Sequence, residues 1–247
     1  MLTEQSAYTN RWRQVSPIAK GCFSLCGMIA AFAAGSPEAA LLVAFIMAMA
    51  TICGAVIPPV RYLRVAAPPL VFLAASTLSL LISLDFGRAA GGISFHPALT
   101  EFPRIAQAAC RSLACLTALL FLALTTPLSD IISLLRRCKL PDTLLDLMTL
   151  CYRTLFVLSE AVHETITAQS ARLGYATISL SLRSLGGLVA NLTVQVWQRS
   201  QALHLAAQAR NNDGALRFLE NRFAHTSRNT AIAVVAGSVM IALAVTL

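Results

Sequence analysis

Four long stretches of this chain carry almost no charge, and each is long enough to cross a lipid bilayer as a helix. They cover residues 39–57, 65–84, 105–126 and 229–247, and a shorter apolar stretch, residues 21–34, precedes them. A helix needs roughly 20 apolar residues to cross the hydrocarbon core of a membrane. Because a helix satisfies its own backbone groups in lipid, these stretches predict an all-α membrane protein with about five transmembrane helices.

The composition excludes several other classes of protein. Hydrophobic residues make up 57% of the 247 residues and charged residues only 12%, about half the charged share of a soluble domain. A disordered chain and an ordinary soluble enzyme are therefore not expected. The seven cysteines contain no C-x-x-C pair and lie mostly in apolar stretches, so we interpret them as small buried side chains rather than a disulfide framework.

The positive charges are distributed unevenly along the chain. With five spans, 16 of the 19 Arg and Lys residues fall on one side of the membrane, and only Arg88, Arg104 and Arg111 fall on or near the other. Counted over the short loops alone, the ratio is 5 to 2 in the same sense. Since cytoplasmic loops carry the excess of Arg and Lys, we expect a multi-pass protein with a cytoplasmic N-terminus.

The segment between the last two spans differs from the rest of the chain. Apolar residues recur in it at helical spacing, interrupted by single charges. We expect one helix over residues 142–172 and a second over residues 188–210, both amphipathic and suited to a membrane interface or a partner groove. The chain is thus divided into transmembrane helices in residues 1–126, a cytoplasmic or interfacial coupling-helix segment in 127–228, and a C-terminal transmembrane helix in 229–247.

The two expected amphipathic helices end in the same way. Both ends read A-x-x-A-R, with Ala171-Arg172 closing the first helix and Ala209-Arg210 closing the second. Gly174 follows the first end and a run of Asn, Asp and Gly follows the second, as is typical after a helix C-terminus. Small residues allow another backbone to approach, and an arginine offers five fixed donors. Two interpretations remain open from this pattern: ordinary Ala-rich helix ends, or a docking surface for a protein partner.

Sequence signatures of catalysis and of cofactor binding are missing. The chain contains no G-x-x-x-x-G-K-[ST], no H-E-x-x-H and no G-x-S-x-G, so we expect no bound ATP, no cofactor, no metal site and no enzymatic activity. Its basic residues are spread singly, without aromatic interleaving, which argues against nucleic acid. Two alternatives stay open at this point: a passive membrane anchor, and an enzyme acting on lipids, for which Asp142 and Asp146 are the closest acidic pair on one helix.

The opening of the chain resembles the CbiQ family, the transmembrane T component (EcfT-like) of energy-coupling-factor cobalt transporters. The resemblance lies in the stretch from Ala7 to Pro17, which contains Asn10-Arg11-Trp12-Arg13, and in Lys20. The order of parts is also similar, and T components carry two Ala-Arg motifs at the ends of their coupling helices. These motifs correspond to Ala171-Arg172 and Ala209-Arg210. They are often Ala-Arg-Gly, whereas this chain has Leu173 and Asn211 in the third position.

The resemblance implies a scaffold function. Ala171, Arg172, Ala209 and Arg210 would dock onto a dimer of CbiO-type ATPases, which hydrolyse ATP while this chain does not. It further implies a CbiM-type substrate-binding membrane subunit, often a CbiN-type small membrane subunit, surrounding lipid, and a bacterial inner-membrane location. Cobalt is the cargo that the family resemblance implies, and the opening favours a transition metal. Nickel, or a vitamin carried by a different substrate subunit, remains an alternative.

Overall fold

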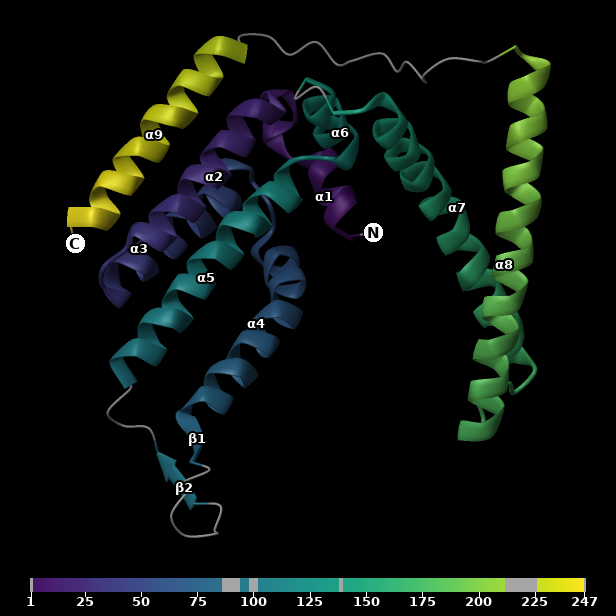
Figure 1. Cartoon of the computed structure of the whole chain (residues 1–247), viewed down its shortest axis with the longest axis horizontal. Coiled ribbons are helices and arrows are strands. Elements are labelled where there is room, and N and C mark those ends of the chain that lie inside the picture. The colour runs from purple at the N-terminus through teal and green to yellow at the C-terminus, as the bar shows by residue number, and fades with distance from the viewer. Residues whose placement is uncertain (1, 86–93, 98–101, 138–139, 212–225, 247) are drawn as a thin grey trace. The chain divides into compact units, whose positions relative to one another are not determined.

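The computed structural model describes residues 2–85, 94–97, 102–137, 140–211 and 226–246 (Figure 1). The chain divides into two compact units, which are described separately below. The first comprises Met1–Leu134 with Asn221–Leu247, and the second comprises Leu135–Glu220.

The first unit is a bundle of helices with one small hairpin. Helices α2, α3, α5 and α9 pack against one another, with α2 and α3 between α9 and α5 (Figure 1). In chain order the elements are α1 (Leu2–Thr9), the 3-10 helix η1 (Arg11–Gln14), α2 (Pro17–Ala33), α3 (Pro37–Met49), the π-helix η2 (Ala50–Gly54), α4 (Pro59–Leu81), β1 (Ile82–Asp85), β2 (Ser94–Pro97), α5 (Phe102–Thr125), α6 (Leu128–Arg137) and α9 (Thr226–Thr246).

The prediction of an all-α membrane protein is confirmed. Within the described ranges, four helical segments are long and apolar enough to cross a membrane: Pro37–Gly54, Pro59–Leu80, Pro103–Thr125 and Thr226–Thr246. The shorter apolar stretch, predicted over residues 21–34, corresponds to α2, an apolar helix of 17 residues. At 1.5 Å per residue, α2 is about 25 Å long, slightly shorter than the hydrocarbon core.

Two predicted boundaries near the third span were wrong. Helix α4 begins at Pro59 and ends at Leu81, whereas the apolar stretch predicted a span over residues 65–84. The residues after it form the antiparallel hairpin of β1 and β2, in which Asp85 pairs with Ser94. Pro68 and Pro69 lie inside this helix, and membrane helices tolerate such prolines because neighbouring groups satisfy the freed carbonyls.

Small residues allow the helices of the first unit to pack closely. The buried core is rich in alanine, with Phe121 fully buried at its centre. The ring of Phe121 meets those of Trp12 and Phe23 edge-on, at centroid distances of 5.7 and 5.3 Å. Where α9 crosses α2, a Cβ added to Gly237 would lie 2.5 Å from the Cβ of Cys26, so the two backbones approach more closely than any larger residue permits.

Helices α2 and α5 run antiparallel, and α2 caps the C-terminal end of α5. The Lys20 ammonium, in the first turn of α2, donates to the Thr125 carbonyl at 2.8 Å. The Asn10 side-chain amide donates to the Leu124 and Thr125 carbonyls at 3.3 and 3.1 Å. The last carbonyls of a helix have no intrahelical donor, and both residues supply one here. Asn10 and Lys20 belong to the opening that resembles the CbiQ family, and this capping gives them a structural role.

At the opposite end of the α2–α5 pair, α5 caps the C-terminal end of α2. Arg111 of α5 donates to the carbonyl of Ala34, the C-cap of α2, at 3.3 Å. Gln107 donates to the Gly35 carbonyl at 3.0 Å, which ties down the turn between α2 and α3. Each helix therefore caps the C-terminus of the other with a cation, and these cations also complement the negative helix ends.

Removing either capping cation should destabilise the first unit. We expect Lys20→Met and Arg111→Met each to lower the free energy of unfolding by about 1–3 kcal/mol, because each removes a charged donor from a buried helix-end carbonyl. The Thr125 carbonyl keeps only the longer bond from Asn10 when Lys20 is replaced. Arg11→Met is the matched control, since the Arg11 side chain is exposed. The measurement is the thermal unfolding midpoint of the purified protein in detergent. Equal midpoints for Lys20→Met and the control would contradict the capping function.

Candidate partner-docking site

The second unit contains a hairpin of two long helices. Helix α7 spans Asp142–Ala171 and α8 spans Ile178–Ala209, and the two pack against each other (Figure 1). The start and end of α7 are as predicted, to within one residue. Helix α8 begins ten residues before the predicted start at residue 188, because Thr177 caps it by accepting from the Leu180 N–H at 3.3 Å.

Both helices end at the predicted arginines, and the two ends have the same backbone geometry. Arg172 is the C-cap of α7 with φ −96° and ψ 17°, and Arg210 is the C-cap of α8 with φ −100° and ψ 9°. The next residue is left-handed in each case, with φ 56° for Leu173 and 48° for Asn211. The sequence repeat therefore encodes a repeated three-dimensional motif.

Backbone hydrogen bonds identify the first end as a Schellman motif. The Gly174 N–H donates to the Gln169 carbonyl at 2.9 Å, and the Leu173 N–H donates to the Ser170 carbonyl at 3.0 Å. At the second end, Asn211 donates to the Gln208 carbonyl at 3.0 Å, which is the equivalent inner bond. Glycine is the usual residue at the left-handed position of this motif. The preference for Ala-Arg-Gly thus has a conformational reason, and Leu173 and Asn211 keep the conformation without the glycine.

Side chains hold the turn between α7 and α8 in place. The Gln169 amide donates to the Ser184 carbonyl at 3.0 Å and accepts from the Tyr175 hydroxyl at 2.7 Å. The Ser184 hydroxyl donates to the Gly174 carbonyl at 2.8 Å. These bonds fix the segment that carries Arg172. The roles of Gln169, Tyr175 and Ser184 were not predicted, because polar residues near a turn carry no periodic signal in the sequence.

The four predicted docking residues are accessible to a partner. Ala171, Arg172, Ala209 and Arg210 are all exposed, and neither guanidinium has a hydrogen bond or ion pair with another residue in the described part of the chain. The two sites are not brought together, since they lie at opposite ends of α8 (Figure 1). With 32 residues in α8, their separation is about 48 Å at 1.5 Å per residue.

Within the described ranges, the acidic and metal-binding residue types form no catalytic arrangement. Asp146 lies 4.0 Å from the Arg136 guanidinium in an ion pair, and among the described residues no three His, Cys, Asp or Glu side chains are placed to share a metal ion. The described cysteines are unbridged, and Cys138 lies outside the described residues.

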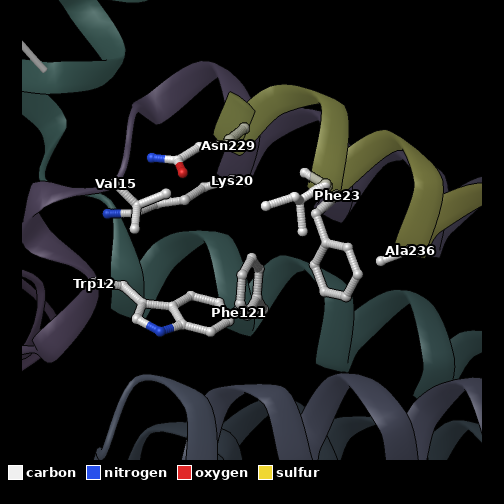
Figure 2. Close-up of a pocket in the computed structure, with 10 residues that line it drawn as sticks. Trp12, Val15, Lys20, Phe23, Phe121, Asn229 and Ala236 are labelled. Carbon is white, nitrogen blue, oxygen red and sulfur yellow. The ribbon is translucent and has the colours of Figure 1, made fainter. Parts of the chain in front are cut away.

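A cavity of about 290 Å³ in the first unit is lined mainly by apolar side chains, including Trp12, Phe23 and Phe121 (Figure 2). Its polar side chains are Lys20, which caps α5, and Asn229. A lysine and an amide provide neither an acid–base pair nor a ligand set, so this cavity is not a candidate catalytic site.

Loss of the Gln169 side-chain bonds should loosen the hairpin turn. We expect Gln169→Leu to raise amide hydrogen exchange in residues 172–177 by roughly tenfold, because two hydrogen bonds of about 0.5–1.5 kcal/mol each are removed. Gln208→Leu is the control, since that side chain is exposed near the second end. Exchange measured by mass spectrometry should be unchanged in α2 and α5. Equal exchange in the turn for both variants would contradict this role.

Comparison with known proteins places the chain in a family. It matches CbiQ, described as cobalt transport protein, over residues 9–220. A cobalt transport protein CbiQ of Rhodobacter capsulatus is 34% identical over 221 residues, covering 89% of this chain and 87% of that protein. A putative fused cobalt transport protein CbiMQ of Methanocorpusculum labreanum is 29% identical over 240 residues, covering 94% of this chain and 40% of that longer protein. The chain therefore belongs to the CbiQ family of cobalt transport proteins, as its opening residues predicted.

Proposed function

We propose that this chain is the transmembrane scaffold of an energy-coupling-factor importer for cobalt ions. The observation that carries the proposal is the pair of matching Arg C-caps, Arg172 and Arg210, exposed at the two ends of α8. In this proposal, Ala171-Arg172 and Ala209-Arg210 each dock onto one subunit of a CbiO-type ATPase dimer. ATP binding draws the two ATPases together, and the docked helix ends move with them.

The geometry of the two ends supports docking onto two partner subunits rather than one. The ends share a backbone conformation, so each can fit the same kind of groove. About 48 Å separates them along α8, so that one small groove cannot hold both. A guanidinium that meets a carboxylate in such a groove contributes roughly 1.5–3 kcal/mol before the cost of desolvation.

The partner that handles the cargo is proposed from a relative. The fused protein of Methanocorpusculum labreanum carries both CbiM and CbiQ in its name, and this chain aligns with 40% of it. We therefore place a CbiM-type subunit, often with a CbiN-type subunit, beside this chain in the membrane. ATP hydrolysis takes place in the ATPases, and this chain acts as a transport subunit without enzymatic activity of its own.

The proposed location is the bacterial inner membrane, with the N-terminus cytoplasmic. The short-loop charge ratio of 5 to 2 supports this orientation. Residues 127–228 then form the cytoplasmic coupling segment, while residues 1–126 and 229–247 lie in the membrane.

Charge reversal at either Ala-Arg end should abolish ATPase docking. We expect Arg172→Glu and Arg210→Glu, singly and together, to leave the protein in the membrane but to prevent recovery of the ATPase, since a carboxylate repels an acidic groove. Arg199→Glu makes the same charge change within α8 and is the control. The measurement is pull-down of the tagged chain from mild detergent, with partners identified by mass. Full assembly and transport in both variants would refute the docking function.

Metal uptake tests the cargo. Cells that express this chain with its cognate CbiM-type and ATPase subunits should accumulate radioactive cobalt, and cells with the Arg172→Glu, Arg210→Glu double variant should not. Nickel uptake is measured in parallel. Transport of nickel but not cobalt would keep the scaffold function and replace the cargo, and no ATP-dependent uptake of either metal would favour a passive anchor.

A further inference from the structure

Leu173 occupies a backbone conformation that does not suit it. Its φ is 56°, in the left-handed region that side chains with a Cβ disfavour and that glycine adopts readily. The side chain is also 72% exposed. A leucine in this position therefore has a disfavoured backbone conformation, and most of its apolar surface is not covered by the rest of the described chain.

Little within the described hairpin compensates for this leucine. Schellman motifs are frequently accompanied by an apolar contact from the residue after the left-handed position, and that residue is Gly174 here. The Gln169, Tyr175 and Ser184 hydrogen bonds hold the turn through polar groups and the backbone, so the turn does not require a leucine. A disfavoured conformation that the surrounding structure enforces is typical of a functional position.

We propose that Leu173 is an apolar anchor that the ATPase subunit docked at Arg172 buries next to the arginine. This inference rests on the proposed function. The two side chains are adjacent in sequence, both are exposed, and the hydrogen-bonded turn fixes their backbone. Burial of Leu173 excludes water from the edge of the contact, and a drier surrounding strengthens the charge-assisted bonds of the guanidinium.

Asn211, after the second Ala-Arg end, occupies the position that corresponds to Leu173. Asn211 has nearly the same backbone conformation, with φ 48°, but asparagine tolerates the left-handed region well and carries no apolar surface. The two docking ends are therefore alike in backbone and different in side chain. At the left-handed position itself, only the end of α7 carries an apolar side chain.

The affinity of full-length variants in lipid nanodiscs for the cognate ATPase tests the proposal. We expect Leu173→Gly and Leu173→Asn to weaken association on the order of tenfold or more, since both lose the apolar contact. Leu173→Met should remain within about threefold of the wild type, because it keeps that contact. Asn211→Gly should leave the affinity unchanged. Leu173→Gly should not unfold at a lower temperature than the wild type, since glycine suits the conformation.

The outcomes separate this inference from the proposed function. Arg172→Glu is measured alongside the other variants. If Arg172→Glu abolishes association and the Gly and Asn variants of Leu173 bind as the wild type does, the anchor is refuted and the docking site stands. If Arg172→Glu has no effect, the proposed function fails. If Leu173→Gly alone weakens binding while Leu173→Asn does not, the loss reflects backbone flexibility and the anchor is likewise refuted.

Discussion

The carbonyl groups at the C-terminal ends of helices impose the main constraint on the first unit. In apolar surroundings these groups have no water to bind, so the protein has to supply donors. Helices α2 and α5 donate hydrogen bonds to each other's C-terminal carbonyls, through Lys20 at one end and Arg111 at the other. Ser24 adds a bond to the Ala118 carbonyl between them at 2.8 Å. Because α3 and α9 pack on this pair, the arrangement of the whole bundle depends on it.

Sequence reasoning predicted the parts of the fold that depend on local composition. Uncharged stretches identified the membrane helices, and apolar residues at helical spacing located both ends of α7 to within one residue. It did not predict the function of Arg111, which appeared only as a charge near the end of a span. The donor and acceptor of that bond are 77 residues apart, and those of the Lys20 bond are 105 apart, distances over which no periodic pattern extends. The start of α8 was placed too late because Gly186 and Gly187 weaken a helix signal.

The candidate site was predicted mainly by resemblance, and the structure adds its physical basis. Ala171-Arg172 and Ala209-Arg210 were found as a repeat, but the repeat alone also fitted ordinary helix ends. The left-handed residues after both arginines show that the similarity extends to the backbone. They also explain why a third-position glycine is common in such motifs while a leucine or an asparagine can replace it. The bonds of Gln169 could not be predicted, since they depend on how tightly the two helices turn.

The length of α8 has a mechanical consequence. A helix of 32 residues is about 48 Å long, and a rotation of roughly ten degrees about one end displaces the other by about 8 Å. Such a helix behaves as a lever arm, in which a small rotation at the base moves the tip by more than one helical turn. The hydrogen-bonded turn at Gln169 keeps the arm attached to α7 at its base. Stiffness of this arm, rather than the strength of any single contact along it, then sets how much of a movement at one end of α8 is carried to the other.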